Sequence, residues 1–206
     1  MKPVQLTLIC HGQTEAQRVG RFALDDDPLR ELPAPMAGLS TGAHCLSAPE
    51  LRALQTAQGL GLQATVDERL RDCDLGRWQG LALKQLQHDD LAGLQAWLAD
   101  PQSAPHGGES VAALCSRVAH WLDSDLAAGE WLVITHPFVI RAAMLHALAA
   151  PLDAFQRIDV QPLAQVHLSH STQWRLQLPS WPCFLWALAL ADNWTVGRVL
   201  WTCAIL

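Results

Sequence analysis

Basic residues are scarce in this sequence. It contains 14 Lys and Arg against 20 Asp and Glu, which gives a formal net charge of -6 at neutral pH. A protein that binds nucleic acid neutralises phosphates with a stripe of basic side chains, and this chain has too few of them to form one. Nucleic acid is therefore not an expected partner.

Other signals are missing too. The six cysteines form no CxxC pair and no repeated spacing, so we expect reduced thiols in a cytoplasmic protein rather than a disulfide framework or a zinc site. Lys2 and Pro3 lead directly into a strand pattern, which does not resemble a signal peptide. There is no internal repeat, and 206 residues suit one well-buried α/β domain better than two.

No apolar run is long enough to span a bilayer. The apolar run at residues 181–191 is too short, and Asp192, Asn193 and Arg198 break any longer span. We expect residues 179–206 to form a hydrophobic C-terminal tail of unknown role. A helix packed on the core or on a partner and a poorly ordered, self-associating tail are equal alternatives, so a homo-oligomer through the tail stays open. A membrane anchor is less favoured, because the tail has no basic face.

Strand and helix patterns alternate along residues 4–178. This alternation predicts an α/β fold with a mostly parallel sheet between helical layers and a site at the carboxyl ends of the strands. Strands are expected at residues 4–9, 44–46, 63–66 and 131–135, with edge strands at 166–168 and 174–176. Helices are expected at residues 13–21, 49–60, 81–97 with an interruption at 88–90, 111–122 and 137–149.

The first strand ends in the most informative stretch. Its apolar run is followed by His11, Gly12 and Thr14, so the strand delivers an imidazole into a crevice. Thr14 and Gln17 have the spacing of a capping box, which starts a helix whose positive end faces the same crevice. An imidazole and free N–H groups suit a phosphate. Taken alone, a core histidine at a strand end explains the stretch equally well.

A similar pattern follows the second strand. Ser47 and Glu50 have capping-box spacing, and Pro49 suits a first helical turn. Arg52 then lies in the first turns of the predicted helix, where its guanidinium could reach a phosphate held near the helix start. Between the first two strands only residues 36–43 remain for a further helix, which is shortened or lost.

Five motifs in order resemble the histidine phosphatase superfamily, which is phosphoglycerate mutase-like. They lie at residues 10–14 (CHGQT), 47–57 (SAPELRALQTA), 70–80 (LRDCDLGRWQG), 107–110 (GGES) and 133–136 (VITH). The resemblance implies a three-layer α/β/α sandwich with a mostly parallel sheet over residues 1–178. It also implies phosphate chemistry without a metal or another cofactor.

By this resemblance His11 is a nucleophile that forms a phosphohistidine, and His136 holds the phosphoryl oxygens during transfer. Asp72 matches the family's acid, which protonates the leaving oxygen and needs a raised pKa. Asp74 is its rival, more consistent with a solvated or capping residue. Arg52 matches a phosphate-binding arginine, whose planar fork suits phosphate oxygens.

Three positions depart from the family's pattern. Cys10 stands where the family has its first phosphate arginine, and Gln17 stands where many members have a phosphate-binding Asn. By their positions both are candidate phosphate-binding residues, together with Arg52 and Arg21. Pro137 follows His136 where many members have Gly, and proline has no N–H to offer. Arg21 matches an arginine common at that offset and could compensate in part for Cys10.

Two functions follow from these matches and departures. The first is a metal-independent phosphomonoester hydrolase that takes a small phosphorylated molecule or inorganic phosphate. The alternative is a catalytically degraded family member that binds a phosphometabolite or another protein. The sequence carries no signature of a particular substrate.

Overall fold

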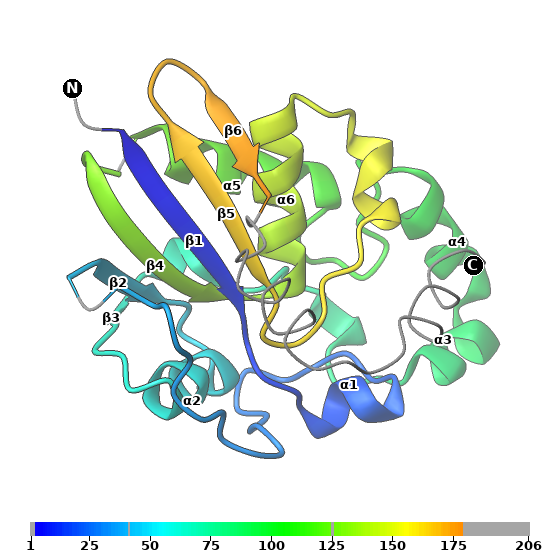
Figure 1. Ribbon diagram of the computed structural model, residues 1–206. Helices are drawn as coiled ribbons and strands as arrows, with labels where there is room; N and C mark the ends of the chain where they lie inside the picture. The colour runs from blue at the N-terminus through cyan, green and yellow to red at the C-terminus, as the bar shows by residue number, and fades with distance from the viewer. Residues whose placement is uncertain (1–2, 41, 125, 179–206) are drawn as a thin grey trace, which may run out of the picture.

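The computed structural model describes residues 3–40, 42–124 and 126–178. The predicted hydrophobic tail, residues 179–206, lies outside the described residues, so its role stays a prediction. Within the described ranges, six strands form one sheet in the order β3-β2-β4-β1-β5-β6 (Figure 1). The strands are β1 (Val4–Cys10), β2 (His44–Ser47), β3 (Thr65–Val66), β4 (Gly129–Thr135), β5 (Gln165–His170) and β6 (Trp174–Gln177).

The sheet is mixed and mostly parallel, as predicted. β1 pairs in parallel with β4, and β2 pairs in parallel with β4 and β3. β5 and β6 are antiparallel additions on the other side of β1. The prediction of two edge strands was half right: β6 is an edge, but β5 lies between β1 and β6.

Helices cover both faces of this sheet. Right-handed crossovers put helices on opposite faces when the chain moves in opposite directions across a sheet. Helix α2 (Leu51–Gly59) therefore lies on one face, and α5 (Val111–Ser124) and α6 (Pro137–Leu148) lie together on the other (Figure 1). The remaining helices are α1 (Glu15–Val19), α3 (Leu83–Asp89) and α4 (Leu91–Ala99), with 3-10 turns η1 (Glu68–Leu70), η2 (Gly76–Trp78) and η3 (Leu152–Arg157).

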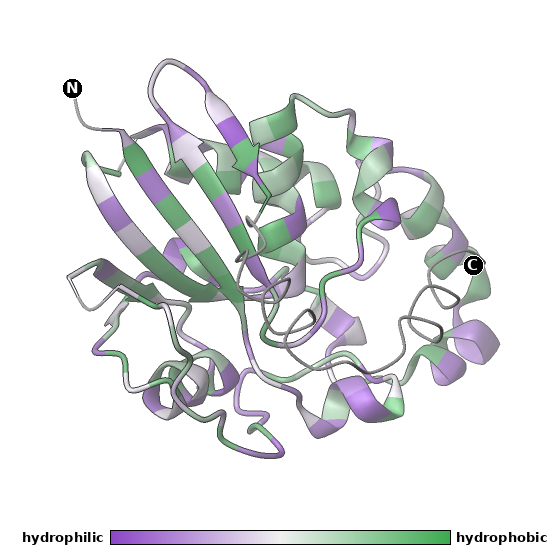
Figure 2. Ribbon diagram, viewed as in Figure 1, coloured by the Kyte–Doolittle hydropathy of each residue, from purple (hydrophilic) through white to green (hydrophobic). Residues whose placement is uncertain are grey.

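Period-2 and period-3.6 patterns explain the core. Figure 2 shows hydrophobic residues alternating with hydrophilic ones along β1, whose Leu6 and Leu8 are buried. On α5 the residues predicted to face the core are all buried: Val111, Leu114, Val118, Trp121 and Leu122. The described residues between Arg21 and His44 contain no helix, which agrees with the predicted loss of one there.

Helix ends follow the local chemistry with one exception. Thr14 and Gln17 form the predicted capping box of α1. The predicted interruption at residues 88–90 is real, because Asp90 ends α3 and caps α4 by accepting from the Gly93 N–H. The capping box predicted for α2 is wrong. α2 begins at Leu51, and its N-cap residue Glu50 makes no capping bond because its carboxylate is used elsewhere.

The core position of β1 leads to a prediction about stability. Leu8 is fully buried in the main hydrophobic cluster. Leu8→Ala should lower the free energy of unfolding by about 2–5 kcal/mol, because it removes buried apolar contacts and leaves a cavity. Chemical denaturation measures the change. Leu148→Ala, at a side chain that is 53% exposed, should change it by less than about 0.5 kcal/mol. Equal losses in the two variants would contradict this packing.

Candidate active site

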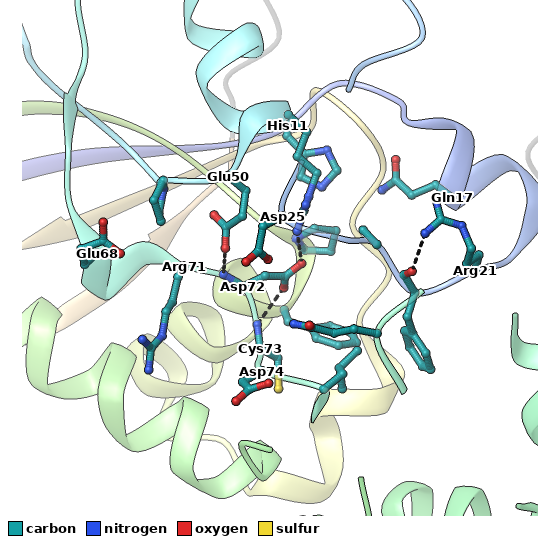
Figure 3. A pocket seen from close by; sticks show the side chains of 18 residues that line it. His11, Gln17, Arg21, Asp25, Glu50, Glu68, Arg71, Asp72, Cys73 and Asp74 are labelled. Carbon is teal, nitrogen blue, oxygen red and sulfur yellow. Dashed lines mark hydrogen bonds and ion pairs between the residues drawn. The ribbon is translucent and has the colours of Figure 1, made fainter. Parts of the chain in front are cut away.

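A cavity of about 630 Å³ opens where β1 and β4 end (Figure 3). Of the predicted site residues, His11, Gln17, Arg21, Arg52 and Asp72 line it. His136 and Cys10 are not among the lining residues, and both are fully buried. The lining also carries three arginines and five carboxylates, so its charge is mixed. They are Arg21, Arg52, Arg71, Asp25, Glu50, Glu68, Asp72 and Asp74.

Two strand ends bring the histidines together. The backbone N–H of His11 donates to the carbonyl oxygen of Thr135 at 2.9 Å, which ties the end of β1 to the end of β4. His136 follows Thr135 directly and precedes Pro137, which begins α6 as predicted. The ring centroids of His11 and His136 are 5.2 Å apart. The structure thus pairs the two histidines that the sequence placed on neighbouring strand ends.

His11 is held as a neutral imidazole with one free nitrogen. Its Nδ1 lies 2.7 Å from the carbonyl oxygen of Gly12, which only accepts, so Nδ1 carries the proton and Nε2 keeps its lone pair. Burial, with the nearby His136 as a smaller cause, lowers the pKa of His11 to about 3. A neutral ring with a free lone pair is the form that a nucleophilic histidine needs.

Arg52 and Asp72 form an ion pair at the cavity wall. The Arg52 Nη2 donates to Asp72 Oδ2 at 2.8 Å, and its Nη1 donates to the Leu24 carbonyl at 2.8 Å. Arg52 is only 2% exposed, and its Nε has no hydrogen-bond partner. A buried guanidinium with a spare N–H is suited to receive an anion.

Asp72 also faces the second histidine. Its Oδ2 lies 3.4 Å from His136 Nδ1. Burial alone raises the pKa of Asp72, but His136 and Arg52 outweigh burial and hold that pKa below its usual range. The raised pKa that an acid needs is therefore not produced by the protein groups around Asp72. Asp74, its rival, is exposed and accepts from the Gly76 N–H, a local turn contact.

The other predicted phosphate ligands have protein partners. The Gln17 side-chain oxygen accepts from the Thr14 N–H in the capping box. Arg21 donates from Nη2 to both carboxylate oxygens of Asp27, at 2.7 and 2.9 Å. Cys10 lies in the hydrophobic core, where burial raises the pKa of its thiol to about 12 and keeps it protonated. Cys10 therefore brings no charge to the cavity.

Glu50 is the residue of the site that the sequence patterns did not identify. The capping-box spacing assigned it to the helix end, yet its Oε2 lies 2.7 Å from His136 Nε2 and its Oε1 accepts from the Asp72 N–H at 2.8 Å. Its side chain is buried. The only sequence signal was an ionisable residue two positions before the predicted phosphate-binding Arg52.

Thr56 and Arg117 hydrogen-bond to the segments that carry the site residues. Thr56 Oγ1 accepts from the Gly12 N–H at 2.9 Å and donates to the Arg52 carbonyl, so these bonds link α2 to the end of β1. Arg117 on α5 pairs with Glu109 and donates to the carbonyls of Arg69 and Arg71, which fixes the segment that carries Asp72.

Among the described residues no cluster of His, Cys, Asp and Glu could hold a metal ion, and no helix there is long and apolar enough to cross a membrane.

Comparison with known proteins identifies the class of this fold and site. Residues 6–182 match the family described as histidine phosphatase superfamily (branch 1). A glucosyl-3-phosphoglycerate phosphatase of Mycobacterium tuberculosis is 31% identical over an alignment of 175 residues, which covers 74% of this chain and 78% of that protein. The chain belongs to the histidine phosphatase superfamily.

Further relatives are more distant or longer. A bifunctional protein of Mycobacterium tuberculosis is 30% identical over 77% of this chain, but the chain spans only about half (48%) of that protein's length. Phosphoserine phosphatase 1 of Hydrogenobacter thermophilus is 25% identical over 74% of this chain and 80% of its own length. Of these two relatives, the second is named as a phosphatase.

Solved structures agree on the fold. The mycobacterial glucosyl-3-phosphoglycerate phosphatase in complex with vanadate superimposes with a TM-score of 0.66 and 27% identity, over 84% of this chain and 97% of that one. The same phosphatase has been solved with inorganic phosphate, with a TM-score of 0.65 and 27% identity, over 84% of this chain and 95% of that one. The α-ribazole phosphatase of Shigella flexneri superimposes with a TM-score of 0.72 and 21% identity, over 84% of this chain and 95% of that one. At this identity the likeness supports the fold alone.

The low pKa of His11 predicts how stability depends on pH. The unfolded chain takes up a proton on this histidine near its ordinary pKa of 6.5, whereas the folded chain does so only at about 3. His11 therefore stabilises the fold fully above pH 6.5, and this contribution falls as the pH drops towards 3, by up to roughly 1.4 kcal/mol per pH unit.

The measurement is the free energy of unfolding at several pH values for the wild type and for His11→Gln, which cannot titrate. The wild type should lose more stability than His11→Gln on acidification. Parallel curves for the two proteins would show that His11 is not held neutral in the folded state.

Proposed function

We propose that this protein is a metal-independent phosphomonoester hydrolase that works through a phosphohistidine on His11. The observation that carries the proposal is the state of His11: its Nδ1 proton is bound to the Gly12 carbonyl and its Nε2 is free. The relatives named as phosphatases support the same reaction class. The mixed lining of the cavity suits a small phosphorylated molecule but does not name one.

The proposed reaction has three roles, which four residues share. His11 Nε2 attacks the phosphorus and forms the phosphohistidine, while the ester oxygen leaves. Arg52 Nε and His136 Nδ1, which are buried and have no hydrogen-bond partner, hold the phosphoryl oxygens as negative charge develops on them. Asp72 gives its proton to the leaving oxygen and then takes one from the water that hydrolyses the phosphohistidine.

Substrate binding itself supplies the raised pKa that Asp72 needs. A phosphoryl group held by Arg52 and His136 draws both groups away from the Asp72 carboxylate, to which they lie 2.8 and 3.4 Å away. It also adds negative charge beside that carboxylate. Both effects favour the protonated acid, so Asp72 is protonated only once a substrate is present.

One observation favours the second candidate, a degraded member that binds a phosphometabolite or a partner protein. Cys10 is buried as a neutral thiol and contributes no charge to the cavity. A charged donor to an anion contributes about 1.5–3 kcal/mol. Two of the other arginines that line the described cavity already have partners, since Arg52 pairs with Asp72 and Arg21 with Asp27. Arg71 is exposed at the edge of the cavity.

Assays with p-nitrophenyl phosphate and a panel of phosphorylated metabolites test the leading proposal. His11→Ala should abolish turnover, because nothing else in the described cavity can form the phosphohistidine, while its melting temperature stays within a few degrees of the wild type. Acid quenching of the wild type should trap a phosphorylated histidine that the variant lacks. A wild type that binds phosphate but turns over no substrate would instead support the second candidate.

The role of Asp72 predicts a dependence on the leaving group. Asp72→Asn should lower kcat for alkyl phosphates by about 10²–10⁴-fold, because the departing alkoxide then lacks a proton donor. The loss should be much smaller for p-nitrophenyl phosphate, whose leaving group departs without one. Asp74→Asn, two residues along, tests the rival assignment. If Asp74→Asn showed the leaving-group dependence and Asp72→Asn did not, the acid would be Asp74.

A further inference from the structure

Glu50 is a buried carboxylate that lines the cavity and contacts His136. It is 5% exposed, and each of its two oxygens is bonded to a group from a distant part of the chain. Oε2 lies 2.7 Å from His136 Nε2, and Oε1 accepts from the Asp72 N–H at 2.8 Å. In the described part of the chain no Lys or Arg is bonded to this side chain, so the imidazole is its only side-chain partner.

The bond to Glu50 decides which nitrogen of His136 faces the reaction. A carboxylate only accepts hydrogen bonds, so the proton in the 2.7 Å contact sits on Nε2 of the ring. The other nitrogen, Nδ1, is buried without a hydrogen-bond partner and lies 3.4 Å from Asp72 Oδ2. With the His11 ring 5.2 Å away, Nδ1 is the atom of His136 that can meet a phosphoryl oxygen.

A phosphoryl oxygen also only accepts hydrogen bonds. A neutral imidazole has a single N–H, and in His136 the Glu50 carboxylate already takes it. We infer that Glu50 is a positioning residue that makes His136 work only as a cation. While Nε2–H is held by Glu50, Nδ1 can donate to an oxyanion only when the ring carries both protons.

The charges around the ring fit this role. Glu50 and Arg52 approach from the start of α2, Asp72 from the segment after η1, and His11 from the end of β1. Two carboxylates thus flank the imidazole, one near each nitrogen. Burial alone raises the pKa of Glu50, but the hydrogen bond from His136 and the Asp72 N–H bring it below its ordinary value, so Glu50 stays ionised.

Glu50→Gln separates this role from simple packing. The amide keeps the shape of the side chain but can donate to His136 Nε2 while its oxygen still accepts from the Asp72 N–H. The neutral ring then carries its proton on Nδ1 and can donate to an oxyanion without a second proton. The variant should therefore keep binding anions at alkaline pH, where the wild type loses them.

The first measurement is calorimetry with sulfate, an oxyanion whose charge is constant between about pH 6 and 10. Towards alkaline pH, the sulfate affinity of the wild type should fall by up to roughly tenfold per pH unit. Glu50→Gln should stay within about twofold over the same interval. Glu130→Gln, an exposed position on β4, is the matched control and should follow the wild type. If Glu50→Gln lost affinity in parallel with the wild type, the inference would be wrong.

The second measurement reads the ring directly. Nitrogen NMR of protein with labelled histidine identifies the tautomer of His136, with His136→Gln to assign its signals. The wild type should be doubly protonated or carry its proton on Nε2, and Glu50→Gln should carry it on Nδ1. A neutral wild-type ring with the proton on Nδ1 would overturn the inference, and this result decides it even if Glu50→Gln fails to fold.

The inference rests on the proposed function only in taking the ligand of His136 to be an oxyanion. The role of Glu50 and the hydrolase function can therefore fail separately. A wild type without any phosphatase activity, but with the expected tautomers and sulfate binding, would remove the hydrolase and keep the role of Glu50. If the protein had phosphatase activity, but sulfate affinity fell equally at alkaline pH in the wild type and in Glu50→Gln, the hydrolase would stand and the role of Glu50 would be wrong.

Discussion

The parallel pairing of β1 with β4 is the contact on which the site depends. Its register sets Cys10 opposite Thr135, so the two strands end together and the next residue of each is a histidine. The pairing lies in the buried centre of the sheet, where Leu8 is opposite Val133 and both are fully buried. A slip of one residue would send every side chain of the strand to the other face, so the hydrophobic core and the pair of histidines are fixed by the same register.

The start of α2 is the second support of the site. Three of its residues reach different partners: Glu50 bonds to His136, Arg52 to Asp72, and Thr56 to the Gly12 N–H. The N-terminal half of one short helix thereby joins both strand ends and the Asp72 segment. Because these bonds are made by buried groups, a loss of any one leaves a donor or acceptor without water to replace it.

Sequence patterns predicted the fold well where periodicity was long, as on α5, and where Pro or a capping pair marked an end, as at Pro137 and Thr14. The motifs that resemble the family led to His11, His136, Arg52 and Asp72, and the structure brings these four side chains together, while their roles stay predictions. The sequence patterns misassigned Glu50, since a capping box and a tertiary hydrogen bond need the same residue type. Nor could they show that Cys10 is buried in the core, because a strand end does not reveal to which face its last side chain turns.

The Asp72 carboxylate occupies the position in which a bound oxyanion would contact Arg52 and His136. One of its oxygens lies within 3.4 Å of both side chains. Any inorganic phosphate that binds must compete with a carboxylate that is tethered to the same site and cannot diffuse away. A tethered competitor weakens the hold on free phosphate. For a hydrolase that works as proposed above, inhibition by the released phosphate should for this reason be weak.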